Sequence, residues 1–527
     1  MECRRCKGNP ESLRQKDGTQ KILVCVYLIF GITFRKVILF YFGGRMDKFL
    51  LWLENALADV NDVLADYVLV ILLVAVGLFY TIRTRFVQVR CFGEGMKRVF
   101  GNIKLRGEKH KSGMSSFQAF ATAVAAQVGT GNIVGACGAI IAGGPGAIFW
   151  MWIIAFLGMA TIYAEAVLAQ KTRKINEDGS VSGGPVYYIK TAFKGNFGKF
   201  LAGFFAVAVV ICLGFVGAMV QSNAISSAVA NVGGFDYTVW GWITGIFIAV
   251  LVGLIVIGGA RRIASVTEKI VPIMAVIYLV GGIIVLAVNV TAVPTAFWYI
   301  IKYAFTPQAI IGGGFGVALK KAISMGAKRG LFSNEAGMGS TPHAHAQANV
   351  KSAHEQGTVA IVSVFIDTFV VLTLTALIVI SCIYVKNPEL LTVVDKNTMV
   401  STAITTIFTN GDVGALIGAI FVGICLTFFA FSTIISWNLF GRINFEYLFG
   451  KKSTIIYSII SIIFTFLGAT LGSDLVWNFN DFVNYLMVLP NALALFVLSK
   501  IVVKELNEHR PKNAVKTPHQ PLSDQVK

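Results

Sequence analysis

The sequence of 527 residues is 55% hydrophobic and only 14% charged, with a mean hydropathy of +0.71. Soluble domains carry about 25% charged residues, so this composition excludes a soluble globular protein and indicates an integral membrane protein. The net charge of +18 does not indicate nucleic-acid binding. The basic residues gather in short loops between apolar segments, where anionic lipid headgroups are the expected partners.

Residues 1–45 are expected to be an extension outside the core of the protein. Arg35 and Lys36 interrupt the apolar run 22–42, and no small-residue cleavage site follows it. The run is therefore predicted to be neither a regular span nor a signal peptide. Met46, which precedes an amphipathic stretch, marks the expected start of the core.

The eight cysteines are not expected to form a disulfide framework. Cys3 and Cys6 make a single pair, without a second pair or histidines at zinc spacing, so a metal site is not expected there. The cysteines inside apolar segments should be buried and behave as small hydrophobes; they are Cys137, Cys212, Cys382 and Cys425.

Eleven apolar stretches are long enough to cross a bilayer, which takes about 20 residues per helix. They lie near 67–82, 115–141, 146–170, 199–230, 237–259, 269–290, 298–325, 357–385, 412–440, 453–472 and 482–503. The predicted fold class is therefore an all-α polytopic membrane protein. Residues 46–114 would hold the first span and a basic loop, and the polar residues 504–527 are expected to form a disordered cytoplasmic tail.

Lysine and arginine gather in alternate loops, as they do in cytoplasmic loops of membrane proteins. The loop 83–111 holds nine of them, whereas the opposite loops 231–236 and 291–297 hold none. We therefore predict a bacterial-type plasma membrane protein with its N-terminus outside and its C-terminus inside. The other basic residues assigned to the cytoplasmic side are Lys171, Arg173, Lys174, Arg261, Arg262, Lys269, Lys320, Lys321, Lys328, Arg329, Arg442, Lys451 and Lys452.

The stretch Ala125–Asn132 interrupts the span near 115–141. Gly129 and Gly131 flank Thr130, and each glycine costs about 1 kcal/mol relative to alanine inside a helix. Hydrocarbon cannot satisfy the freed backbone groups, so a broken helix here would line a cavity and hold a small ligand and an ion. The alternative is close helix packing through small residues.

A second break is expected in the span near 298–325, which contains the consecutive glycines Gly312–Gly314. The two broken spans are the first and sixth of a block of ten, 115–503. Because five spans reverse the direction of the chain, the halves 115–290 and 291–503 are predicted to form a 5+5 inverted repeat with a binding site at the bilayer midplane. The repeat is inferred from the spacing and the two breaks alone.

Several strings of residues resemble the alanine/glycine:cation symporter family, in the right order over about 46–505. The most specific is Gly143-Gly144-Pro145-Gly146-Ala147-Ile148-Phe149-Trp150-Met151-Trp152. The others are Gly129-Thr130-Gly131-Asn132, Thr81-Ile82-Arg83-Thr84-Arg85-Phe86, Ser182-Gly183-Gly184-Pro185, Lys328-Arg329-Gly330-Leu331-Phe332-Ser333-Asn334-Glu335-Ala336-Gly337 and Phe431-Ser432-Thr433.

The resemblance implies a leucine-transporter-type fold and uptake of alanine or glycine, or D-alanine, coupled to Na⁺ or H⁺ by alternating access. The expected partners are a small neutral amino acid, the coupling ion and membrane lipids, with the protein acting as a monomer. An enzyme or an ATP-driven pump is not expected, because the chain contains no Walker-type loop, nucleophile elbow or metalloprotease motif. The alternatives are an ion channel, disfavoured because filters are usually built from several symmetric subunits or repeats, or a transporter of another small amine or carboxylate.

The resemblance also implies residues for ion binding. One sodium ion would be bound by backbone carbonyls and hydroxyls, namely those of Ala125, Val128, Phe429, Ser432 and Thr433. A second ion site would use the carbonyl of Gln127 and the side chain of Asn132.

Substrate contacts are expected around both breaks. The amides of Thr130 and Gly131, at an opened helix end, suit a carboxylate, with Gln127 beside them. Gln221 and Asn223 are mid-span amides that either meet the substrate or form interhelical hydrogen bonds. The pocket walls are expected from Gly314, Phe315 and Trp437, although most aromatic residues in such a chain face lipid or core.

Two carboxyl groups lie within predicted spans, where charges are expensive and often functional. Glu165 is expected to pair with Arg173 or another basic loop residue. Asp367 is expected to be a structural, hydrogen-bonded carboxylate, with an ion- or proton-linked role as the alternative; the resemblance does not place it in the pocket. His343 and His345 point away from each other on a helix, so no metal site is predicted there.

Overall fold

The computed structural model describes residues 45–101, 113–177, 179–233, 237–306, 315–471 and 474–509, and these are helical almost throughout. The chain divides into two compact units, Met1–Asp59 and Val60–Lys527. The described part of the first unit is the start of helix α2 (Arg45–Val63). Every feature considered below belongs to the second unit.

Nine helices in the described residues are long and apolar enough to span a membrane, and one bent pair makes up to ten. The first span joins the end of α2 to η1 (Leu64–Leu69) and α3 (Val70–Arg83), and the bent pair consists of α6 (Ser116–Gln127) followed by η2 (Gly131–Gly135) and α7 (Ala136–Gly143). Two further spans are each built from several elements: α10 (Gly195–Val209), η3 (Val210–Val216) and α11 (Gly217–Gly233) form one, and α17 (Ala353–Val364), η4 (Phe365–Leu372), α18 (Thr373–Val379) and η5 (Ile380–Val385) form the other. The other spans contain the single helices α8 (Gly146–Thr172), α12 (Tyr237–Val256), α13 (Gly259–Val288), α20 (Gly411–Phe449), α21 (Thr454–Thr470) and α22 (Asp474–Val497). The predicted all-α, multi-span architecture is confirmed, and the inverted repeat stays a prediction.

The remaining elements connect these helices. They are α4 (Val87–Arg90), α5 (Phe92–Phe100), the antiparallel strands β1 (Lys174–Ile175) and β2 (Val181–Ser182), α9 (Pro185–Ala192), α14 (Val293–Phe305), α15 (Phe315–Asn334), α16 (Pro342–Gln347), η6 (Pro388–Thr392), α19 (Met399–Thr405), η7 (Lys451–Ser453) and α23 (Ser499–Glu508). The segment 504–527, expected to be disordered, is therefore helical as far as Glu508. Residues 510–527, like Cys3 and Cys6, lie outside the described residues.

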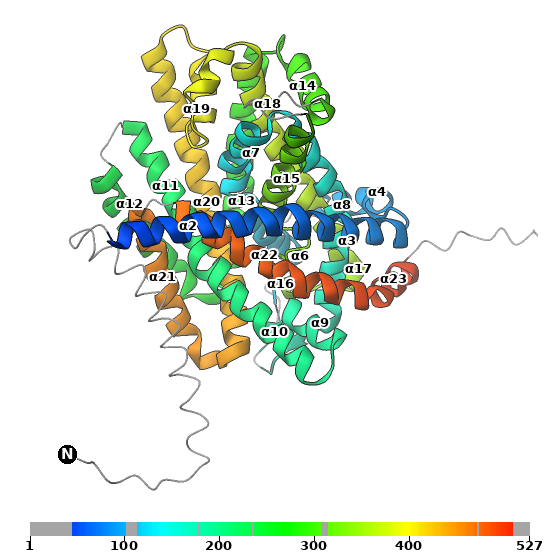
Figure 1. Ribbon diagram of the computed structural model, residues 1–527. Coiled ribbons are helices and arrows are strands. Elements are labelled where there is room, and N and C mark those ends of the chain that lie inside the picture. The colour runs from blue at the N-terminus through cyan, green and yellow to red at the C-terminus, as the bar shows by residue number, and fades with distance from the viewer. Residues whose placement is uncertain are drawn as a thin grey trace, which may run out of the picture. The chain divides into compact units, whose positions relative to one another are not determined.

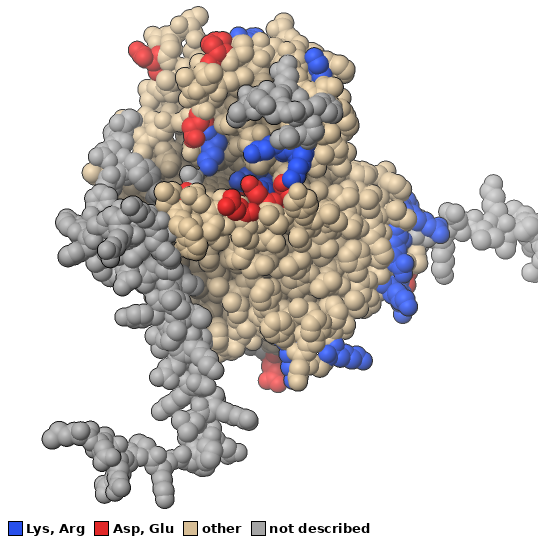
Figure 2. Space-filling model, in the orientation of Figure 1, with Lys and Arg blue, Asp and Glu red and all other residues tan. Residues whose placement is uncertain are grey.

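Helix α8 lies in the interior of the helix bundle, whereas α13 lies at its rim. In the most apolar window of each, 72% of the residues of α8 are buried, against 28% for α13. Apolar side chains that remain exposed suit contact with lipid. Figure 2 shows a broad surface without lysine, arginine, aspartate or glutamate, as expected for lipid-facing flanks.

Several spans contain π-helical turns, marked η1 to η5. A π turn holds an extra residue relative to an α-helical path and is frequent at functional sites. η3 separates α10 from α11, and η4 separates α17 from α18. η4 carries Asp367, so this carboxylate lies on an irregular stretch of helix.

The span predicted near 298–325 is not formed as a single helix. α14 ends at Phe305, and its 13 residues extend about 20 Å, too short for a hydrocarbon core of about 30 Å. Figure 1 places α14 at the same end of the bundle as α19, away from α9 and α16. The chain instead descends through α15, is irregular over 335–341, and continues in α16. The glycines Gly312–Gly314 lie outside the described residues.

The basic residues of α15 were expected in a cytoplasmic loop, but they lie on a helix. Arg329 lines a cavity together with Asp395 and Lys396, which belong to a segment predicted to lie on the opposite side. Lys328 forms an ion pair with Asp62 at 2.5 Å. Because acidic partners compensate these charges, they do not report on membrane orientation in the way that unpaired loop lysines do.

Candidate functional site

The first break lies between α6 and α7, which are bent by 46° relative to each other. At the break, the Gly129 N–H donates to Asn132 Oδ1 (3.0 Å), and the Thr130 N–H donates to Gln221 Oε1 (3.3 Å). Side chains thus satisfy backbone donors that have no helical partner. The break predicted from this stretch is confirmed, and Gln221 from α11 lies directly against it.

The oxygen atoms expected to bind sodium lie close together where α20 faces the end of α6. Thr433 Oγ1 lies 2.9 Å from the Ala125 carbonyl oxygen and 3.0 Å from the Phe429 carbonyl oxygen. Ser432 Oγ lies 2.9 Å and 3.5 Å from the Phe429 and Ala125 carbonyl oxygens, respectively. Val128, the C-terminal cap of α6, is buried with ψ 86°. Four of the five expected groups are therefore in mutual contact.

Only a residue without a side chain fits at Gly129. A Cβ atom there would lie 2.5 Å from Thr433 Oγ1 and 3.4 Å from Gln221 Oε1, and a Cβ atom at Gly131 would lie 3.1 Å from Ser333 Cα. The glycines therefore allow α20 and the end of α15 to approach the first break closely.

The second break follows α15 and begins at Glu335. This residue has φ 57°, a left-handed conformation that is uncommon without glycine. Its buried carboxylate accepts a hydrogen bond from Trp437 Nε1 (2.5 Å) and another from the Ser340 hydroxyl. Gly337 and Gly339 also take positive φ values, 89° and 83°. Trp437, expected to be a pocket wall, thus anchors the second break.

Glu165 also supports the second break and does not pair with Arg173, contrary to expectation. Glu165 Oε2 accepts the Gly337 N–H (3.1 Å), and Oε1 accepts from Asn491 Nδ2 (2.6 Å). Asn491 also donates to the Gly337 carbonyl (2.8 Å), while Arg173 donates to the Ala346 carbonyl (3.0 Å). Neutral amide donors, rather than a cation, therefore satisfy this buried carboxylate.

The two breaks contact each other directly. Gln127, the last residue of α6, donates from Nε2 to the carbonyl oxygen of Asn334, the last residue of α15, at 2.7 Å. Carbonyls at a helix C-terminus lack helical partners, and this bond satisfies one of them across the contact between α6 and α15.

Asp367 lies beside the first break rather than away from it. Its carboxylate accepts hydrogen bonds from Asn132 Nδ2 (2.6 Å), Ser333 Oγ (2.9 Å) and Thr368 Oγ1 (2.8 Å). The expected hydrogen-bonded carboxylate is therefore present. Because Asn132 and Ser333 belong to the two broken helices, however, Asp367 joins both of them.

Four buried polar atoms around the breaks have no hydrogen-bond partner within the described part of the chain. They are Gln127 Oε1, Thr130 Oγ1, Thr341 Oγ1 and Ser436 Oγ. Leaving such an atom unsatisfied costs about 1–3 kcal/mol, so unpaired atoms in a native structure call for an explanation such as a missing ligand. They suit a small polar molecule with both donors and acceptors.

The remaining predicted substrate residues are not brought into this region. Asn223 Nδ2 donates to the carbonyls of Gly468 (3.4 Å) and Leu471 (3.3 Å), which is the interhelical hydrogen bond considered as the alternative. Gly314 lies outside the described residues, and so does the side chain of Phe315.

His343 and His345 have different partners, as their spacing predicts. His343 Nε2 lies 2.7 Å from Asn444 Nδ2, and His345 Nδ1 lies 2.9 Å from Gln356 Nε2. Each histidine therefore belongs to a separate hydrogen-bonded pair.

A cavity of about 320 Å³ lies between α7, α15 and α22. Arg329 at its wall pairs with Asp481 (3.4 Å) and lies 5.8 Å from the ring centre of Trp477. The Phe332 ring lies between Trp477 (5.6 Å) and Trp437 (6.1 Å). A row of aromatic rings therefore separates this cavity from the second break.

The sequence contains a local signal for the break over 335–341. Gly337-Met338-Gly339 repeats the spacing of Gly129-Thr130-Gly131, and the polar run Ser333-Asn334-Glu335 precedes it. Ser333, Asn334, Glu335 and Ser436 had no predicted role, because the consecutive glycines upstream are the stronger helix-breaking pattern by propensity.

Known proteins resemble this chain over most of its length. Residues 50–522 match the model described as the sodium:alanine symporter family. The "Sodium/alanine symporter AgcS" of Methanococcus maripaludis is 38% identical over 461 residues, which cover 86% of this chain and 97% of that protein. The "Probable sodium/glutamine symporter GlnT" of Bacillus subtilis is 37% identical over 468 residues, covering 88% and 93%.

A solved structure shares the fold. The crystal structure of MhsT in complex with L-phenylalanine matches 76% of this chain and 93% of that chain, with a TM-score of 0.56. The sequence identity is 15%, so this likeness concerns the arrangement of helices alone.

Proposed function

The chain belongs to the sodium:alanine symporter family, and from that premise we propose that it takes up alanine or glycine together with Na⁺. Its family and fold are those of Na⁺-coupled amino-acid transporters rather than enzymes. One observation carries the proposal: the Ser432 and Thr433 hydroxyls face the Ala125 carbonyl beside the first break. The unpaired Thr130 hydroxyl belongs to the same break.

The substrate's carboxylate is proposed to bind at the first break. There η2 begins at Gly131, and the positive end of the helix dipole favours an anion; the Thr130 N–H would exchange Gln221 Oε1 for the carboxylate. The unpaired Thr130 hydroxyl and Gln127 Oε1 would bind the carboxylate and the ammonium group. Phe332, whose ring packs edge-on against that of Trp437, would bound the space for the substrate's side chain and favour a small one. One relative is named for alanine and another for glutamine, so uptake assays should compare substrates of different size. D-alanine should be among the substrates tested.

Sodium is proposed to bind between α6 and α20. The groups there are carbonyl and hydroxyl oxygens, which suit a hard cation. The ligands would be the carbonyls of Ala125, Val128 and Phe429 and the hydroxyls of Ser432 and Thr433. With the ion in place, both hydroxyls would turn their lone pairs toward it and cease to donate to the carbonyls.

A second cation position is proposed at Asn132, beside the carbonyl of Gln127. Asp367 and Ser333 would complete it, because a carboxylate and a hydroxyl add negative charge and a further oxygen. This position would take either a second Na⁺ or a proton.

Transport is proposed to proceed by alternating access in a monomer. The cavity beside Arg329 and Trp477 would lead the substrate from the outside toward the breaks. We place the N-terminus outside and the C-terminus in the cytoplasm of a bacterial-type plasma membrane. No step needs ATP, because the ion gradient supplies the free energy.

The proposal is tested by uptake into proteoliposomes. Radiolabelled alanine should accumulate above equilibrium when an inward Na⁺ gradient is imposed, and a sodium ionophore should abolish the accumulation. Unlabelled glycine should compete, and glutamine should compete weakly. Accumulation driven by a pH gradient alone would identify H⁺, and not Na⁺, as the coupling ion. Loss of an existing alanine gradient that depends on neither ion would indicate a channel.

A further inference from the structure

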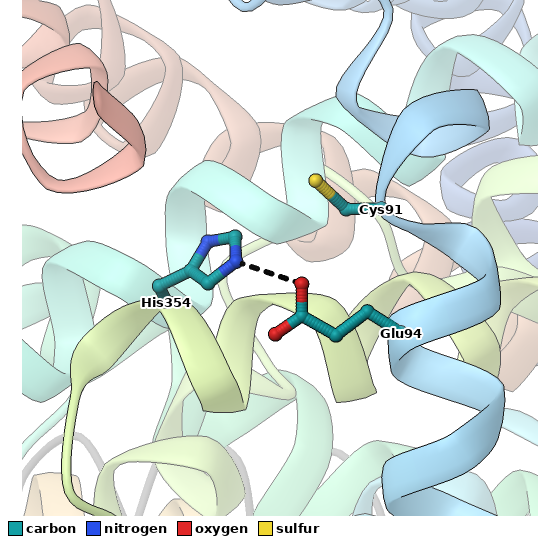
Figure 3. A group of neighbouring side chains, drawn as sticks. All are labelled: Cys91, Glu94 and His354. Carbon is teal, nitrogen blue, oxygen red and sulfur yellow. Dashed lines mark hydrogen bonds and ion pairs between the residues drawn. The ribbon is translucent and has the colours of Figure 1, made fainter. Parts of the chain in front are cut away.

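A cluster of metal-binding side chain types lies where α4, α5 and α17 meet, apart from both breaks. Cys91 separates α4 from α5, Glu94 lies in the first turn of α5, and His354 lies in the first turn of α17 (Figure 3). The cysteine sulfur, a carboxylate oxygen and a histidine nitrogen lie within 4.8 Å of one another. His354 Nε2 and Glu94 Oε2 are 3.3 Å apart.

Neighbouring residues orient these side chains as outer partners do in metal sites. The Tyr163 hydroxyl lies 2.7 Å from His354 Nδ1, so Nε2 faces the other two ligands. Arg98 donates to Glu94 Oε1 at 2.8 Å, which leaves Oε2 directed toward His354. His509 stacks on the His354 ring, with ring centres 5.3 Å apart.

We propose that Cys91, Glu94 and His354 bind a Zn²⁺ ion. Zinc accepts thiolate, imidazole and carboxylate ligands, and three protein ligands with a water in the fourth position are common. Nitrogen and oxygen ligands of a tetrahedral zinc lie about 3.3 Å apart, which matches the His354–Glu94 separation. On binding, the Cys91 thiol gives its proton to water and becomes the thiolate ligand.

Cys91 is more exposed than the other cysteines of the described chain, so an ion can reach this site. Cys91 is half-buried, whereas Cys137, Cys212, Cys382 and Cys425 are buried. The Glu94 side chain is 39% exposed, which provides a route of entry for the ion.

A zinc ion would clamp α5 to α17. These helices already pack closely, since a Cβ atom at Gly95 would lie 2.3 Å from the Thr358 carbonyl oxygen. α17 leads directly into η4 and Asp367. If the chain transports as proposed, fixing this end of the span should slow the exchange between its two states, and this part of the inference rests on the proposed function.

Zinc binding is tested with the purified full-length chain in detergent, stripped of metal, by competition against a chromophoric zinc chelator. One zinc per chain is expected. Cys91→Ser and His354→Gln should weaken binding by more than about 100-fold, and Tyr163→Phe by about tenfold. Cobalt(II) should give a near-ultraviolet thiolate charge-transfer band that Cys91→Ser abolishes.

Cys382→Ser is the matched control, because Cys382 is buried in the same span, roughly 40 Å along the helix from His354. It should bind zinc like the wild type. Equal zinc affinity in the wild type and Cys91→Ser, or a cobalt spectrum without the charge-transfer band, would overturn the site and leave an ion-pair network. Monodisperse elution of each variant excludes misfolding. Zinc that binds but leaves alanine uptake unchanged would overturn the clamp while supporting the site.

Discussion

The first break is short, and neutral amide side chains satisfy its backbone N–H groups, whereas the second spans residues 335–341 and is held by carboxyl groups. At the first break, the amide side chains of Asn132 and Gln221 accept backbone N–H groups. At the second, Glu165 accepts the Gly337 N–H, and Glu335 binds Trp437. Both breaks therefore leave backbone groups without helical partners, and amide side chains satisfy them at the first break whereas carboxyl groups do so at the second.

This difference indicates a division of labour. At the second break, two carboxyl groups each make two hydrogen bonds, so we expect it to be the more rigidly held. At the first break, the unpaired Thr130 hydroxyl and Gln127 Oε1 lie beside the proposed sodium site, and we expect the ligand to bind there. We expect changes at the first break to alter ligand and ion binding, and changes at the second to alter the scaffold.

The largest effect is expected from Gly129→Ala at the first break. The added Cβ would lie 2.5 Å from Thr433 Oγ1, and overpacking by such a contact costs about 1–3 kcal/mol. Initial uptake rates should fall by up to about 100-fold. Gly203→Ala is the control, because a Cβ at Gly203 has no atom within 4 Å; wild-type rates in Gly129→Ala would contradict the close packing.

Glu335→Gln tests the second break. The substitution keeps the size of the side chain but replaces one of the two oxygens that accept hydrogen bonds from Trp437 and Ser340 by an amide nitrogen, and a buried donor left without an acceptor costs about 1–3 kcal/mol. Uptake should fall roughly 30-fold, and the melting temperature should fall as well. Glu389→Gln, at an exposed position, should change neither. A Glu335→Gln variant with normal stability and a changed sodium requirement would instead assign Glu335 to ion binding.

Thr433→Ala should act on sodium alone. Loss of one oxygen ligand should raise the half-saturating sodium concentration by about tenfold, with the maximal uptake rate retained at high sodium. Thr427→Ala on the same helix is the matched control, because the Thr427 hydroxyl donates to the Gly423 carbonyl. Identical sodium dependence in wild type and Thr433→Ala would remove Thr433 from the ion site.

The smallest effect is expected from Asn223→Ala. Its amide binds carbonyls of α21 and its neighbouring loop, and such interhelical bonds average about 0.6 kcal/mol in membrane proteins. The KM for alanine should therefore change by less than about threefold. A larger change in KM without a loss of stability would return Asn223 to the substrate site.

The sequence predicted best what depends on local pattern. Long apolar runs identified the spanning helices, because hydrocarbon permits few alternatives to a helix. The pattern around Gly129 and Gly131 identified the first break, and the resemblance named Ser432 and Thr433, which do face Ala125.

Contacts between distant parts of the chain were not predictable in this way. Asp367 binds Asn132 across 235 residues, and Asn491 binds Glu165 across 326. No local pattern reports such pairs. The interruption over 335–341 was not predicted for a related reason: its residues are stabilised by side chains from α8, α20 and α22. The break predicted at Gly312–Gly314 lies outside the described residues and stays a prediction.

The π turn η4 changes the direction in which the span that begins with α17 presents its packing face, so the parts before and after the turn face different neighbours. An ordinary α-helix advances by about 100° per residue, so the extra residue in η4 offsets the register of everything that follows it. The part before the turn presents its face to α5 and α8, and α18 after it presents a face to α13, where Thr375 meets Tyr278. The π turn therefore allows one continuous span to pack against α5 and α8 before the turn and against α13 after it.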